Sequence, residues 1–178
     1  MFYQVTTWMV ILLACAVTPI GAQSVSGADT VLRKFEGNWR THVTIRSAKL
    51  ASREIQLSGM GVGQVTLGGQ YVEYRAKTDP VPEQSPEEDL QINTWDPITK
   101  IYHHWLFDSE GNRFIRTGTW DEASKTLTWT ADELGGTVLI HDRFTHRDRI
   151  EWDLVRLDST GQVTMQIDAW MTRLPERK

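Results

Sequence analysis

The fold is decided by a seven-residue unit that occurs twice, as TWDPITK at residues 94–100 and as TWDEASK at residues 119–125. Both copies share Thr-Trp-Asp, three variable residues and Lys. An alternating run follows each copy, over residues 101–107 and 126–130. A strand that ends on Trp, turns at Asp and restarts after Lys is one unit of an antiparallel meander. The two copies therefore predict consecutive β-hairpins.

The rest of the chain shows the same alternation of short strands and tight turns. The turns are rich in Asp, Asn, Ser and Gly, which cap turns or accept a positive φ. Connections this short leave no room for crossover helices, which excludes a parallel βαβ architecture. We predict a first strand that begins at Asn38 and further strands over residues 53–67, 70–77, 90–95, 100–107, 113–120, 125–131, 136–145, 148–157 and 162–173.

An antiparallel meander of this size has to protect its edge strands, and closure into a barrel removes the edges. We therefore predict an all-β protein, an antiparallel up-and-down barrel of about eight to ten strands. A short N-terminal helix should precede the first strand, beginning near Asp29 and stopping at Gly37. Three glycines at period two, Gly59, Gly61 and Gly63, leave one face of their strand without side chains. That pattern suits a sharp bend or a closely approaching backbone.

Residues 1–22 have the features of a secretory signal peptide. Residues 5–17 are almost wholly apolar but too few to span a bilayer as a helix, and small and polar residues follow up to Ala22. The segment has no Lys or Arg, so the α-amino group is its one positive charge. We expect cleavage near Ala22 and export to the periplasm or the extracellular space. A linker over residues 23–28 and a single barrel domain over residues 29–178 should follow.

The single cysteine, Cys15, lies within this apolar segment. The stretch from Leu12 to Cys15 partly resembles the lipobox of bacterial lipoproteins, so a lipoprotein anchored through Cys15 is an alternative. If the segment is removed, the mature chain holds no thiol for a disulfide, a nucleophile or a metal ligand.

Composition and motifs exclude several function classes. The net charge is −4 and no basic block is present, which argues against a nucleic-acid partner. No apolar run is long enough for an integral membrane span. The chain has no Gly-x-Ser-x-Gly elbow, P-loop or dinucleotide-binding fingerprint. His103 and His104 are adjacent on a strand and point to opposite faces, so they cannot chelate one ion together, and we expect neither a metal nor a cofactor.

Large apolar residues at period two identify the inner face of each strand. In the strand after the first repeat this face is predicted to hold Ile101, Trp105 and Phe107. In the strand that ends in the second repeat it holds Phe114 and Trp120. Aromatic residues at these positions either fill the core or line a ligand pocket.

Three polar residues share the register of these inner faces: His103, Arg116 and Asp142. A buried charge needs a partner, and the simplest arrangement is an Arg116–Asp142 ion pair with His103 nearby. Alternatively, Arg116 reaches into a cavity, where its guanidinium would bind a carboxylate or a phosphate. The candidate ligand-binding residues are therefore His103, Trp105, Arg116, Trp120 and Asp142.

Residues 32–174 resemble the exported bacterial proteins grouped as domain of unknown function 1579. The matching stretches are FEGNW at residues 35–39, LGGQYV at 67–72, WDPITKIYHHW at 95–105, GTWD at 118–121 and KTL at 125–127. The Gly-x-Trp step after a short helix is also similar to lipocalin-type barrels. The resemblance implies a calycin-like barrel, and it supplies no activity and no catalytic residues.

The sequence favours a non-enzymatic, exported barrel that binds a small, partly apolar ligand in its interior. An acidic ligand is one option, because an inward Arg116 would suit an anionic head group. One alternative is a small enzyme that uses His103, Arg116 and Asp142 as an acid–base set on such a ligand. The other is an interaction protein with a filled barrel, whose outer surface would carry a contiguous aromatic patch.

Overall fold

The structure is a computed structural model of the 178-residue chain, and it describes residues 29–47, 54–82, 86–133 and 135–175. The predicted signal peptide, the predicted linker and Cys15 lie outside these residues.

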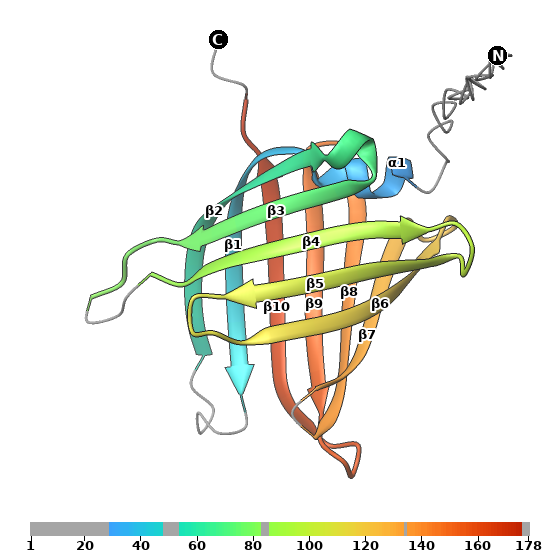
Figure 1. Cartoon of the computed structure of the whole chain (residues 1–178). Coiled ribbons are helices and arrows are strands. Elements are labelled where there is room, and N and C mark those ends of the chain that lie inside the picture. Colours follow the sequence, from blue (N-terminus) through green and yellow to red (C-terminus); the bar gives the residue numbers. More distant parts are fainter. Residues whose placement is uncertain (1–28, 48–53, 83–85, 134, 176–178) are drawn as a thin grey trace, which may run out of the picture.

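Within the described residues, ten antiparallel strands form a closed barrel in which consecutive strands pair throughout. The strands are β1 (Gly37–Ser47), β2 (Glu54–Thr66), β3 (Tyr71–Thr78), β4 (Glu88–Asp96), β5 (Ile101–Asp108), β6 (Arg113–Asp121), β7 (Thr126–Glu133), β8 (Gly136–His146), β9 (Arg149–Leu157) and β10 (Val163–Arg173). The last strand pairs with the first, from Trp39 opposite Arg173 to Ser47 opposite Met165 (Figure 1). The predicted all-β, up-and-down barrel with eight to ten strands is confirmed.

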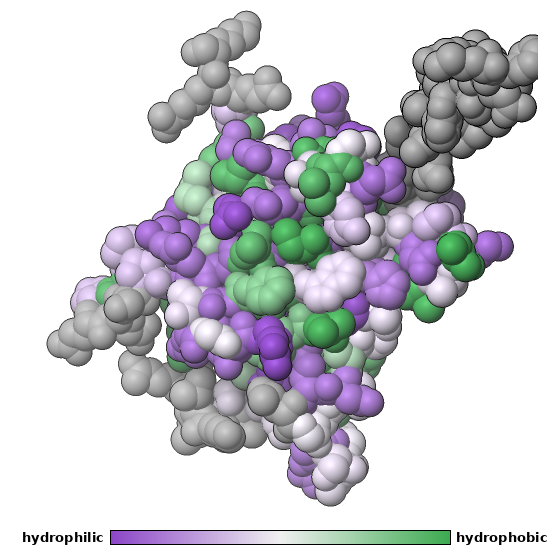
Figure 2. Space-filling model, viewed as in Figure 1, coloured by the Kyte–Doolittle hydropathy of each residue, from purple (hydrophilic) through white to green (hydrophobic). Residues whose placement is uncertain are grey.

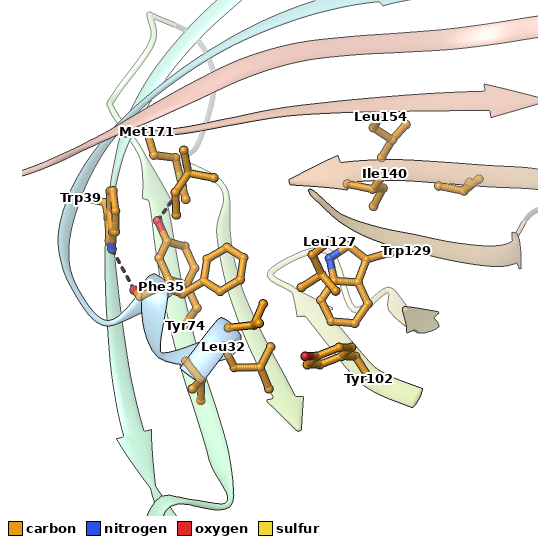
Figure 3. Packing of buried hydrophobic residues seen from close by; sticks show 14 residues of the cluster. Leu32, Phe35, Trp39, Tyr74, Tyr102, Leu127, Trp129, Ile140, Leu154 and Met171 are labelled. Carbon is orange, nitrogen blue, oxygen red and sulfur yellow. Dashed lines mark hydrogen bonds between the residues drawn. The ribbon is translucent and has the colours of Figure 1, made fainter. Parts of the chain in front are cut away.

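One end of the barrel is covered by the helix that precedes β1. The helix α1 (Asp29–Leu32) continues into a 3₁₀ turn, η1 (Arg33–Phe35), and places Leu32 and Phe35 in the core (Figure 3). Trp39, near the start of β1, is fully buried and donates its Nε1–H to the carbonyl oxygen of Phe35 at 2.8 Å. The predicted short helix is confirmed, and its apolar side chains close this end of the barrel.

Both copies of the repeated unit form the same hairpin turn. In the first copy, Asp96 Oδ1 accepts the backbone N–H of Ile98 at 2.8 Å, and Thr99 Oγ1 donates to Asp96 Oδ2 at 2.7 Å. In the second copy, the carboxylate of Asp121 accepts the two equivalent hydrogen bonds, at 2.9 and 2.7 Å. The lysine that ends each copy has a positive φ, 57° in the first and 53° in the second. The residues that the copies share therefore fix the geometry of the turn.

The inner face of β5 differs from the prediction by one residue. Tyr102 and His104 are buried in the barrel, whereas His103 and Trp105 lie on the outside and stack with 5.8 Å between ring centroids. Because β5 carries large side chains on both faces, period two alone does not decide its orientation. His104 pairs directly with the inward-facing Arg116 of β6, and directly paired residues share a face of the sheet. The inward orientation predicted for His103 and Trp105 is therefore wrong.

The three glycines of β2 face the interior and give room to their neighbours. A Cβ at Gly63 would lie 2.0 Å from the carbonyl oxygen of Phe35, and one at Gly61 would lie 1.9 Å from the hydroxyl of Tyr74. A Cβ at Gly59 would lie 2.5 Å from a backbone oxygen of β3. The close approach predicted from these glycines is confirmed, and it allows η1 to pack directly on the barrel wall.

Candidate functional site

A cavity of about 370 Å³ occupies part of the barrel interior. Its lining includes side chains from all ten strands, and Phe35 of η1 contributes to it at the covered end. The apolar part of the wall includes Val43, Leu57, Ala76, Ile140, Leu154 and Ile167. The lining extends to residues 87–89 and 108–110, where the strands end away from α1 (Figure 1). Apolar walls around a space of this size are typical of a small-molecule site.

His104 is the most unusual polar side chain in this cavity. It is 5% exposed, and neither Nδ1 nor Nε2 has a hydrogen-bond partner. Its ring meets the indole of Trp129 edge-on, with 5.1 Å between centroids. Burial, followed by the nearby positive charge of Arg116, lowers the pKa of His104 to about 3. At neutral pH the imidazole is therefore uncharged, with one nitrogen that can donate a hydrogen bond and one that can accept.

Arg116 reaches the interior as predicted, but its partner is not Asp142. Its Nε donates to Glu133 Oε1 at 2.7 Å and its Nη2 to Glu133 Oε2 at 3.4 Å. Both side chains are 6% exposed. The predicted Arg116–Asp142 ion pair is therefore wrong. β7 runs past residue 131, where the sequence prediction ended it, to Glu133, whose side chain follows Leu127 and Trp129 on the inner face.

Asp142 accepts a hydrogen bond from Trp129 Nε1 at 2.7 Å. Burial raises the pKa of Asp142 to about 6, and the hydrogen bond from Trp129 partly offsets this effect. Trp129 therefore contacts both buried titratable groups, Asp142 through its N–H and His104 through its ring (Figure 3 shows its position beside Tyr102).

The five residues proposed from the sequence do not form one cluster. Arg116 and Asp142 line the cavity. Trp120 faces inward near the covered end, where it packs edge-on against Phe144 with 5.7 Å between centroids and lines a separate hollow beside α1. His103 and Trp105 are on the outer face and do not line the cavity.

His104 was not among the residues predicted from the sequence, although the repeat contains a signal for its inward orientation. In the second copy, Trp120 pairs with Leu127, seven residues later. The same interval from Trp95 leads to Tyr102, which pairs with Trp95 across the turn. Because Tyr102 faces inward, the residue two positions further along β5, His104, does so as well.

The outer surface of β4, β5 and β6 carries an apolar patch. Figure 2 shows apolar side chains gathered near the middle of the face that these strands form. Across the strands, Trp105 is paired with Ile92 on one side and Ile115 on the other, and Phe107 is paired with Leu90. Ile115 is 62% exposed and Phe107 is 44% exposed. We call these five residues the outer patch.

The described residues include no group of three or more His, Cys, Asp or Glu side chains placed to hold a metal ion. They also include no helix of the length and apolar character needed to cross a membrane.

The described domain shares its ten-stranded, calycin-like barrel fold with solved structures. The S-type phycobiliprotein lyase CPES from Guillardia theta is similar with a TM-score of 0.62 at 9% identity, over 84% of this chain and 94% of the lyase. Rv2717c from M. tuberculosis is similar with a TM-score of 0.63 at 13% identity, over 84% of this chain and 99% of that protein. Identities this low show a shared fold alone. No family model matches the chain, and no curated protein matches it in sequence.

Proposed function

We propose that this protein binds a small, partly apolar ligand inside the barrel. The observation that carries the proposal is the cavity of about 370 Å³, which combines an apolar wall with a buried, unpartnered His104. A native core rarely leaves both nitrogens of a buried imidazole without partners, because an unmade hydrogen bond costs free energy. A ligand that supplies the missing partner and fills the apolar space accounts for both features. The calycin-like fold, shared with a phycobiliprotein lyase, supports a binding role at the level of architecture.

The acid–base set proposed for an enzyme is not assembled. His103 lies outside the barrel, so it cannot act with Arg116 and Asp142 on a ligand in the cavity. Arg116 is also held by Glu133 rather than free to contact a substrate. The outward position of His103 and the pairing of Arg116 with Glu133 therefore favour a binding protein over an enzyme.

A cavity-blocking variant tests the proposal. Ala76 lines the cavity from β3, and Ala76→Phe would fill part of it. Thr117→Phe, on the exposed outer face of β6, is the matched control. Native mass spectrometry of the purified protein and a thermal-shift screen with medium-chain amphiphiles should show a ligand in the wild type and in Thr117→Phe. A ligand present at about 100 times its Kd should stabilise the fold by about 2.7 kcal/mol.

The same screen can contradict the proposal. Wild-type protein without any bound mass or thermal shift would do so, as would an Ala76→Phe variant that binds as well as Thr117→Phe.

Export and family membership form a further part of the proposal. The apolar segment over residues 5–17 and the small residues that follow it support export to the periplasm or the extracellular space. The repeated TWD units and the LGGQYV stretch at residues 67–72 support membership of the domain of unknown function 1579 group. Subcellular fractionation, with the mass of the mature N-terminus, separates cleavage near Ala22 from lipidation at Cys15. An uncleaved protein confined to the cytoplasm would rule out export.

Protein–protein interaction is a second candidate function, and the outer patch favours it. Contiguous apolar side chains on an exposed sheet face are typical of interaction surfaces. Self-association can be measured by sedimentation equilibrium, with Ile115→Glu in the patch and Val62→Glu on the outer face of β2 as its control. A dimer lost only in Ile115→Glu would support this function, and a monomer at every concentration would contradict self-association through the patch.

A further inference from the structure

Most of the buried polar side chains that line the cavity already have hydrogen-bond partners. Arg116 is paired with Glu133, and Asp142 accepts the N–H of Trp129. The exceptions are His104, whose two ring nitrogens are both buried without partners, and the single hydroxyl oxygen of Thr41. His104 is the larger of the two, because it leaves two polar atoms unpaired rather than one. An N–H of His104 that points at the ring of Trp129 makes only a weak hydrogen bond to its π-system, and the second ring nitrogen still has no partner.

The charges around the cavity disfavour an anionic ligand. Carboxylates dominate the end of the lining that lies away from α1: Glu87, Glu88, Asp89, Asp108 and Glu110. Lys77 is the cation among them, and it is paired with Glu88. An anion that enters there would meet like charge before it reaches the interior. Inside, it would find a guanidinium already neutralised by Glu133, so its desolvation would be poorly compensated.

We propose that the ligand carries an uncharged hydrogen-bonding head group, a hydroxyl or an amide, which binds to the imidazole of His104 while its apolar part fills the cavity. This inference rests on the proposed binding function and specifies the class of ligand. A hydroxyl or an amide both donates and accepts, which matches the one donor and one acceptor of a neutral imidazole. The pairing of Arg116 with Glu133 also removes the reason for expecting an acidic ligand.

Arg156, a positively charged residue on the inward register of β9, favours an anionic ligand, and the test therefore includes it. Arg156 on β9 pairs with the fully buried Val138, its Nε is buried without a partner, and it does not line the cavity. If the ligand were anionic, its head group would have to extend beyond the described cavity to reach Arg156. The two residues therefore define two variants with opposite expected effects.

The experiment uses three probes with the same chain and different head groups: 1-octanol, octanoate and octylammonium. Their affinities for the full chain are measured by calorimetry at pH 7.5, for the wild type and for the variants His104→Leu, His104→Gln and Arg156→Met. We expect 1-octanol to bind at least about tenfold more tightly than either charged probe. His104→Leu should weaken 1-octanol about tenfold, the usual effect of one lost hydrogen bond, and His104→Gln should retain most of the affinity.

Two further readouts distinguish a ligand contact from a purely structural role of His104. Without ligand, His104→Leu should melt at a higher temperature than the wild type, since it removes two unpaired buried nitrogens. The imidazole ¹⁵N shifts of His104 should move when 1-octanol is added, and those of the outward His103 should not.

Each of the other outcomes contradicts the inference, and one of them also contradicts the proposed binding function. Tightest binding of octanoate, lost in Arg156→Met, would assign the head group to Arg156 and contradict an uncharged ligand. Tightest binding of octylammonium would contradict it as well. Equal binding of 1-octanol by the wild type and His104→Leu would reject the role of His104 but keep the proposed function. Absence of binding by every probe would reject the proposed function together with the inference.

Discussion

At the level of single residues, the buried pair of Arg116 and Glu133 shows that a charged side chain inside the barrel needs a partner of opposite charge. Both side chains are 6% exposed, so neither charge can be satisfied by water. Removing one partner from such a pair leaves a buried charge uncompensated, which costs more than the pair itself contributes. The pair therefore constrains the interior more strongly than the ion pairs on the surface do.

The variant Glu133→Gln should be strongly destabilised, because it leaves the guanidinium of Arg116 buried without an anion. We expect its free energy of unfolding to fall by about 3–5 kcal/mol, measured by urea denaturation. The control is Glu88→Gln, which breaks the exposed pair with Lys77 and should change stability little. The double variant Arg116→Met/Glu133→Leu should recover much of the loss. Equal effects of Glu133→Gln and Glu88→Gln would contradict the burial of the pair.

Asp142 should make stability depend on pH. Its pKa is about 6 in the folded protein, above the 3.8 of an exposed aspartate, so the folded state binds the proton more tightly. The stability that this group contributes is therefore complete below pH 4 and is lost as the pH rises through 6. Asp142→Asn can still accept the N–H of Trp129 but cannot ionise. Relative to the wild type, it should gain on the order of 2–3 kcal/mol between pH 4 and pH 8 in urea denaturation. A difference that is constant over this range would contradict the raised pKa.

At the level of elements, the repeated hairpins show how the sequence sets a turn. The carboxylate of Asp96 accepts three hydrogen bonds within its own turn. Lys100 takes a φ of 57°, which costs free energy for any residue with a Cβ. The turn is therefore specified by its aspartate and slightly strained at its lysine.

Lys100→Gly should relieve this strain. The left-handed backbone costs about 1–2 kcal/mol for a residue with a Cβ, and glycine loses about 0.5–1 kcal/mol more through its unfolded-state entropy. We therefore expect a net gain of about 0.5–1 kcal/mol in the free energy of unfolding, measured by urea denaturation. Lys100→Ala is the control, since it removes the side chain but keeps the strain and should bring no gain. A Lys100→Ala variant as stable as Lys100→Gly would show that the side chain, not the backbone, is responsible.

Most of the barrel could be predicted from the sequence, because turn residues and period-two alternation are local signals. The strand β5 marks where they fail. Its two faces, with Tyr102 and Trp105 as examples, are both rich in large side chains, so hydrophobicity could not orient it. Its orientation is set by pairing with β4 and β6, and that information lies outside the strand.

The site was harder to predict than the fold for a related reason. Arg116 was recognised because it interrupts an apolar face, but its partner depends on which residues meet across β6 and β7. Glu133 lies seventeen residues further along the chain and beyond the predicted end of its strand. A charged residue near a strand end reads equally well as part of a solvated turn. Only the pairing of the strands shows whether Glu133 is a buried strand residue or part of a solvated turn.

At the level of the whole molecule, closure of the barrel makes every strand junction equivalent. The ladder between β1 and β10 spans nine residue pairs, from Trp39 with Arg173 to Ser47 with Met165, and resembles the ladders between consecutive strands. The C-terminal end of the domain also contacts the first strand, because the backbone N–H of Leu174 donates to the carbonyl oxygen of Asn38 at 2.7 Å. The order in which the strands are connected should therefore matter less than the completeness of the ring.

A circular permutant tests this equivalence. Joining residue 175 to residue 29 by a short glycine-serine linker, with new termini between Thr160 and Gly161, keeps all ten ladders and opens one exposed turn. We expect the permutant to fold with the same far-ultraviolet circular dichroism as a linear chain of residues 29–175, and with a modestly lower Tm. The matched truncation, residues 29–160, lacks β10 and leaves backbone N–H and C=O groups along one edge of β1 and of β9 unpaired, so it should be unfolded or aggregated. A folded, monomeric truncation would show that closure contributes little, and an unfolded permutant would show that the original chain order is essential.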